Sequence, residues 1–182
     1  MRVKFRLLRI LLILALSIFI VSCSNQEQKT EITSLLIDNS DMPANWPFSE
    51  FSNIGIDKDR SRDSVAISFN SDLYPDTFSS IQNVYRFNSV FTAKQDYLKE
   101  LEFYKRYYYL PPEWNYTSDK ASESNIFCKK NTFVICVWMA RYEDIVIELQ
   151  VSIIPSRMSF DDMENIVKKI DARAIETIIT PP

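Results

Sequence analysis

Apolar residues recur along this chain with two different periods, and the two periods predict alternating strands and helices. Residues 145–153 place an apolar side chain at every second position, the period of a strand with one buried face. Weaker alternation predicts strands over 48–56, 65–69 and 81–87. Residues 125–142 predict a hairpin, in which 132–139 is apolar on both sides and therefore forms a central, covered strand.

Two further segments show the helical period and begin at capping residues. Ser89 can cap a helix that ends before Pro111, because proline cannot continue a helix. Ser159, with Asp162 three residues later, predicts a capping box for a second helix. The expected buried stripes are Val90, Tyr97, Leu101, Tyr104 and Tyr108, widened by Phe91 and Leu98, in the first helix, and Phe160, Met163, Ile166, Val167, Ile170 and Ala174 in the second.

The order of the elements is three strands, a helix, three strands and a helix. Short connections between neighbouring strands favour an antiparallel sheet of about six strands, with a central helix and a C-terminal helix packed on it. This is the α+β class. A chain of 182 residues has room for one such domain, which we place at residues 32–182.

The N-terminus has the features of an export signal. Arg2, Lys4, Arg6 and Arg9 precede residues 10–22, a run of thirteen uncharged residues. A secretory signal needs about 7–15 such residues, whereas a membrane-spanning helix needs about 18 or more. The length therefore predicts a signal peptide over residues 1–22.

The last residues of this run, Ile20-Val21-Ser22-Cys23, resemble the lipobox of bacterial lipoproteins. The resemblance implies cleavage before Cys23, a lipid on its thiol, and a polar tether over residues 23–31. It also implies a place in the cell envelope, outside the cytoplasm, and Ser24 resembles the sorting residue for the outer membrane where the source has one. Ordinary cleavage after Ser24 and an uncleaved anchor are the alternatives.

Composition removes several classes of function. Without residues 1–22 the chain has 17 basic and 24 acidic residues, and a net charge of −7 disfavours nucleic acid as a partner. The sequence has no histidine and a single glycine, Gly55. Histidine-based catalysis, histidine zinc sites and glycine-rich phosphate loops are therefore absent, and we expect no cofactor.

An acidic stretch over residues 57–63 resembles the start of a calcium loop, but Arg62 and Ser68 stand where an EF-hand needs glycine and glutamate. A solvated turn is the simpler interpretation, and we expect no metal site.

If Cys23 is lipidated, Cys128 and Cys136 remain as a pair in an exported protein. Both lie four residues from Thr132, the expected tip of the hairpin, and so face each other across the two strands. We predict a cross-strand disulfide. A redox pair and two free buried thiols are the alternatives, although the spacing is not C-x-x-C.

Aromatic residues crowd the end of the first helix and the loop after it. Tyr107, Tyr109 and Trp114 do not fit the helix's apolar stripe, and we predict that they form an exposed platform for a protein or glycan partner. Packing of the helix against the loop is the alternative.

Element order and the motif Asp41-x-Pro43-x-x-Trp46 resemble PsbP-like modules and other small exported α+β lipoprotein domains. The resemblance implies an accessory or binding role and transfers no catalytic residue. We therefore expect a lipid-anchored, non-catalytic binding module. A carboxylate-based envelope hydrolase and a purely structural envelope protein are the alternatives.

Overall fold

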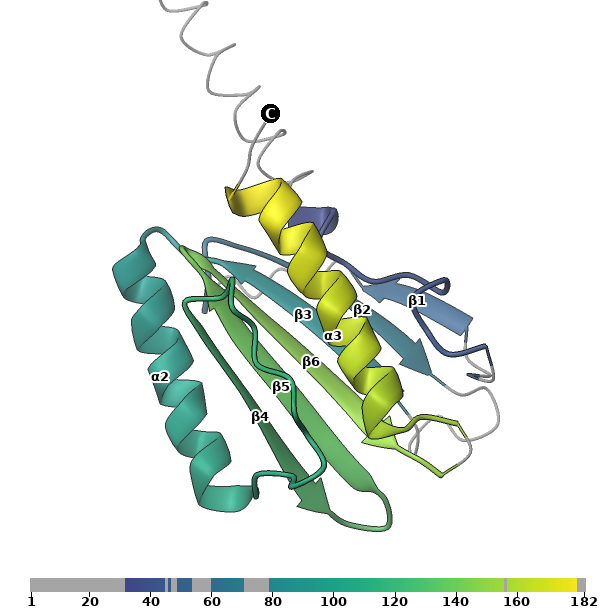
Figure 1. Cartoon of the computed structure of the whole chain (residues 1–182). Coiled ribbons are helices and arrows are strands. Elements are labelled where there is room, and N and C mark those ends of the chain that lie inside the picture. The colour runs from purple at the N-terminus through teal and green to yellow at the C-terminus, as the bar shows by residue number, and fades with distance from the viewer. Residues whose placement is uncertain are drawn as a thin grey trace, which may run out of the picture.

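The computed structural model describes residues 32–44, 46, 49–53, 60–70, 79–155 and 157–179 (Figure 1). Two α-helices, a sheet and a short π-helical end make up this part of the chain. The elements in chain order are β1 (Ser49–Asn53), β2 (Asp63–Asn70), β3 (Ser79–Arg86), α2 (Val90–Tyr107), β4 (Glu123–Lys130), β5 (Val134–Tyr142), β6 (Ile145–Ile153), α3 (Phe160–Ala174) and η1 (Ile175–Ile179).

The strands form one antiparallel sheet with the order β1-β2-β3-β6-β5-β4. β6 returns to pair with β3, which leaves β4 at one edge of the sheet. The α+β class, the antiparallel sheet, the central helix α2 and the C-terminal helix α3 are confirmed.

The two helices cover opposite faces of this sheet. Trp138 and Ile147 belong to the core cluster that includes the buried side of α3. Met139 follows Trp138 in β5, and Val146 precedes Ile147 in β6. Both pack with Tyr97 of α2. Because successive side chains of a strand point to opposite faces, the sheet has an α3 face and an α2 face. The prediction that β5 is covered on both sides is therefore confirmed.

Both predicted helix starts are confirmed by their capping bonds. The Ser89 hydroxyl accepts from the Thr92 N–H at 3.2 Å, and the Ser159 hydroxyl accepts from the Asp162 N–H at 3.1 Å. The Asp162 carboxylate in turn accepts from the Ser159 N–H at 2.8 Å and completes the capping box.

The predicted buried stripe of α2 is partly wrong. Tyr97 is fully buried as predicted, and Leu101, Tyr104 and Tyr108 are partly buried against the same cluster. Val90, Phe91 and Leu98 are exposed, and Ala93 is fully buried instead. A single sheet lies beneath α2, so only a narrow strip of the helix finds apolar partners. On α3 the predicted stripe is buried except for Phe160, which is half-buried.

The segment at 32–44 belongs to the core of the α3 face. Ile32 and Leu35 are fully buried, and Met42 and Trp46 are tucked in as the sequence predicts. The buried amide of Gln82 on β3 accepts from the Ile37 N–H at 2.7 Å and donates to the Leu35 carbonyl at 2.8 Å. This pair of bonds holds the segment against the sheet.

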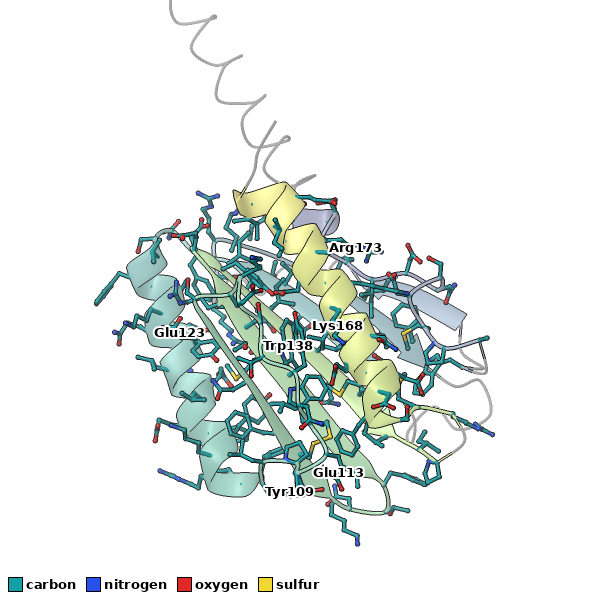
Figure 2. All side chains as sticks on the ribbon, viewed as in Figure 1. Tyr109, Glu113, Glu123, Trp138, Lys168 and Arg173 are labelled. Atoms are coloured by element: carbon teal, nitrogen blue, oxygen red, sulfur yellow. A yellow bond between two sulfur atoms is a disulfide. The ribbon has the colours of Figure 1, made fainter. Side chains whose placement is uncertain are left out.

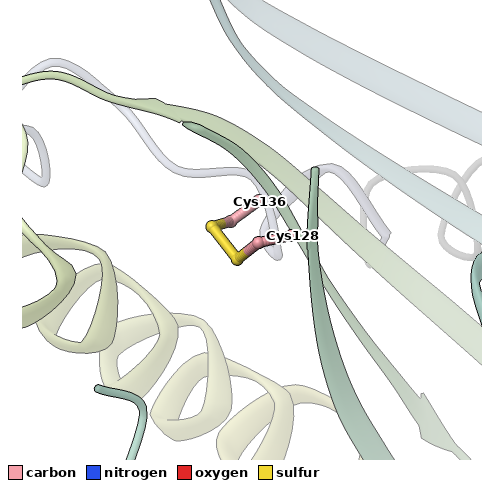
Figure 3. Close-up of a disulfide and its surroundings, with 2 residues drawn as sticks. All are labelled: Cys128 and Cys136. Atoms are coloured by element: carbon pink, nitrogen blue, oxygen red, sulfur yellow. A yellow bond between two sulfur atoms is a disulfide. The ribbon is translucent and has the colours of Figure 1, made fainter. Parts of the chain in front are cut away.

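Cys128 and Cys136 form the predicted disulfide between β4 and β5 (Figure 3). The two residues are direct partners in the strand register, with Cα atoms 4.1 Å apart. The predicted lipid site Cys23 and residues 57–59 of the acidic stretch at 57–63 lie outside the described residues.

Candidate functional site

The segment between α2 and β4 crosses the α3 face beside α3 and contains most of the predicted aromatic residues (Figure 1). Tyr109 pairs with Cys128 at the outer edge of β4 through two backbone bonds of 2.8 Å. Trp114 is half-buried, donates its indole N–H to the Tyr116 carbonyl and packs edge-on against the Tyr116 ring. The segment therefore folds back onto the sheet.

The predicted platform of Tyr107, Tyr109 and Trp114 is divided by the fold. Tyr107 is 55% exposed, but its ring lies against Phe103 on α2, 5.1 Å away between ring centres. Tyr109 is 43% exposed and lies at the edge of β4 (Figure 2). Trp114, by contrast, lines a concave surface.

A buried carboxylate fixes the far end of this segment. Asp171 of α3 is 4% exposed and accepts hydrogen bonds from the hydroxyls of Tyr116 at 2.7 Å, Ser118 at 2.6 Å, and Tyr142. Burial, and then the bond to this carboxylate, raise the pKa of Tyr142 and of Tyr116, so both remain donors at neutral pH.

The hydroxyl of Ser118 also accepts from the backbone N–H groups of Lys120 and Ala121, at 3.1 and 2.9 Å. Asp171 and Ser118 together set where the segment turns into β4. Nothing in the sequence predicted this cluster, because Asp171 lies 55 residues from Tyr116 and 53 from Ser118.

Between this segment and β4 lies a hollow of about 140 Å³, which we call the edge hollow. A cavity of about 150 Å³ in another protein holds one benzene ring, so the edge hollow has the size of a single ring. Its lining is Leu110, Trp114, Tyr116 and Thr117 from the segment, Ser124, Asn125 and Ile126 from β4, and Trp138 from β5.

The three lining residues of β4 are consecutive. Side chains at 124 and 126 point to one face of the sheet and that at 125 to the other, so a single hollow reaches all three only along the backbone edge. The edge hollow therefore contacts the outer edge of β4 and has Trp138 as its inner wall.

The backbone groups of β4 at this edge point outward. Cys128 uses its N–H and C=O on the side away from β5, since both bond to Tyr109. Backbone groups alternate in direction along a strand, so those of Ile126 and Ser124 share the outward direction of Cys128. Within the described residues, the structure records no hydrogen-bond partner for the outward groups of Ser124 and Ile126.

The edge hollow combines flat apolar walls with polar groups at its rim. Trp114, Tyr116 and Trp138 supply ring surfaces, while Thr117 and Ser124 supply hydroxyl groups. The Asn125 side chain points to the other face, where its amide donates to the Tyr97 hydroxyl at 2.7 Å. Such a surface binds a ring by stacking and orients it by hydrogen bonds.

A second polar cluster lies between α2 and the sheet. Arg60 contacts Asp96 of α2 and Glu148 of β6, at 2.8 and 2.7 Å, and its guanidinium lies over the Tyr85 ring. Burial raises the pKa of Glu148, while Arg60 opposes that shift. These carboxylates are paired with Arg60, and we interpret the cluster as an attachment of α2 to the sheet.

The described part of the chain contains no group of acidic and cysteine side chains arranged to hold a metal ion. Its helices are all too short or too polar to cross a membrane. No protein family, curated protein or solved structure matches this chain.

Proposed function

We propose that this protein is a lipid-anchored binding module of the cell envelope, and that it holds a ring-bearing ligand in the edge hollow. The observation that carries the proposal is the composition of the hollow: three aromatic walls beside a strand edge with outward backbone groups. All eight lining residues are aromatic, aliphatic, hydroxyl or amide residues, a set suited to binding rather than to acid–base catalysis.

The anchor in this proposal is a lipid on Cys23, outside the cytoplasm. Its support is the basic N-terminus, the short apolar run and the lipobox-like residues 20–23. Eight residues separate Cys23 from the fully buried Ile32. Since an extended chain spans about 3.5 Å per residue, this tether would keep the domain within about 30 Å of the membrane surface. The ligand would then be a component of the envelope or a molecule that reaches it.

Replacing Trp114 with alanine should weaken ring binding and leave the domain folded. Trp114 supplies one wall of the hollow but is only half-buried, so we expect ring affinity to fall by at least about tenfold and stability by about 1–3 kcal/mol. The measurement is a two-dimensional NMR titration of the ¹⁵N-labelled domain with two probes. One is an end-blocked pentapeptide with a central tyrosine, and the other is tri-N-acetylchitotriose.

Tyr107→Ala is the matched control, because Tyr107 is exposed and aromatic but does not line the hollow. It should bind both probes as the parent protein does. If neither probe shifts the resonances of the lining residues, the hollow is not a binding site and a structural role in the envelope is favoured instead.

A further inference from the structure

We propose that the edge hollow receives an extended peptide, which adds a strand to the outer edge of β4 and inserts one ring-bearing side chain between Trp114 and Trp138. This inference rests on the proposed function and names its ligand class. It follows from three features of β4: the outward backbone groups, their spacing, and the pairing of Cys128 with Tyr109.

The outward groups form a repeated pattern. Ser124 and Ile126 each direct one N–H and one C=O away from β5, and two residues of a strand span about 6.8 Å. Two donor–acceptor pairs at this spacing match the backbone of another strand, which repeats its own pair every two residues. An acetamido sugar has one amide per ring and satisfies only one of the two pairs.

The structure already contains one residue paired to this edge in the way that an added strand would be. Tyr109 is antiparallel to Cys128 and makes both backbone bonds that an added strand would make. The chain then leaves the edge, because Leu110 is followed by Pro111, which has no N–H to continue the pairing. An added strand would continue from Tyr109 past Ile126 and Ser124. The edge hollow lies at that position.

Tyr109 also limits the ligand. A peptide that pairs with Ser124 and Ile126 cannot continue past Cys128, since Tyr109 occupies that position. The ligand strand must therefore end or turn away there, so a short segment or a chain end fits best. The hollow has room for one ring, so phenylalanine, tyrosine or proline at the position beside Trp114 is favoured over a long charged side chain.

The test uses end-blocked pentapeptides of alternating threonine and valine with tyrosine or alanine at the centre. The mature, folded domain is titrated with each peptide. We expect the tyrosine peptide to shift the Ser124 and Ile126 amides, and the alanine peptide to bind at least about tenfold more weakly. A tyrosine peptide with N-methyl groups on the amide nitrogens of its first, third and fifth residues cannot donate the strand bonds, because the N–H groups of alternate residues share one direction, and it should also lose about tenfold or more.

Ser124→Pro removes one outward N–H of the edge. The pairing with β5 is expected to survive, because Asn125 and Phe127 direct their backbone groups inward. We expect about tenfold weaker binding of the tyrosine peptide. Lys130→Pro is the matched control, since it removes an outward N–H of the same strand beyond the Tyr109 pairing and away from the hollow.

Each result has one meaning. Peptide binding that depends on the ring, on the peptide's N–H groups and on Ser124 supports strand addition. Equal binding of the N-methylated and unmodified peptides overturns it, even if Ser124→Pro fails to fold. If chitotriose shifts the lining residues and the peptides do not, the ligand class is wrong while the proposed binding function stands. If neither does, both proposals fail.

Discussion

Replacing Asp171 with alanine is expected to destabilise the domain by about 3 kcal/mol or more. The carboxylate accepts from three hydroxyls, and Tyr142 and Ser118 are themselves buried. A buried donor left without an acceptor costs about 1–3 kcal/mol, so the loss of one acceptor for several donors has a large total effect. Denaturant unfolding followed by fluorescence would measure it as a lower midpoint.

Asp119→Ala is the control for this variant. Asp119 is exposed and, within the described part of the chain, forms its ion pair with the neighbouring Lys120, so its loss should change stability by less than about 0.5 kcal/mol. The Asp171 variant should also loosen the segment at 116–118 and with it the wall of the edge hollow. An Asp171→Ala protein as stable as the control variant would show that the hydroxyl cluster does not fix this segment.

Replacing Cys23 with alanine should remove all lipid from the protein. Each acyl chain contributes about 0.8 kcal/mol per buried CH₂, so two chains hold a protein on a membrane and their absence releases it. The full-length chain would be expressed in a bacterial host fed an alkyne-tagged fatty acid. We expect strong labelling and an N-terminus at Cys23 in the parent protein, and no labelling in the variant, by gel fluorescence and intact mass.

The control for the lipid experiment is the double variant Cys128→Ser and Cys136→Ser. These two thiols form the disulfide, so labelling should be unaffected by their loss. If the Cys23→Ala protein still takes up the fatty acid, or the parent protein begins at another residue, the lipoprotein interpretation is wrong.

Local patterns in the sequence were sufficient for most of the fold. The period-2 run of β6, the capping residues Ser89 and Ser159, and the equal distances of Cys128 and Cys136 from the hairpin tip each involve residues close in the chain. Periodicity and capping act over a few residues, so they are visible without tertiary contacts.

The phase of α2 was harder to predict than its presence. Apolar residues occur around most of this helix, so the sequence does not say which line faces the sheet. Phe91 and Leu98 were assigned to the buried stripe but are exposed, while the small Ala93 is buried. The sheet beneath α2 determines which side of the helix is buried. The strands that α2 packs on include β5 and β6, which come later in the chain.

The candidate site depends on contacts that the sequence does not show. Tyr107, Tyr109 and Trp114 are close in the chain and were predicted to act together, but α2 ends between the first two and directs Tyr107 toward Phe103. Trp138 became a wall of the hollow only through the pairing of β5 with β4. The aromatic surplus indicated the region of the candidate site but not the contribution of Trp138.

Amide hydrogen exchange of the free domain would show whether β4 keeps an open backbone edge beside the aromatic hollow. Ser124 and Ile126 should exchange at least about a hundredfold faster than Asn125 and Phe127, whose N–H groups point to β5. Cys128, paired with Tyr109, should be as slow as Phe127. Equal protection of Ser124, Asn125, Ile126 and Phe127 would mean that the edge is closed and that no peptide strand can be added to it.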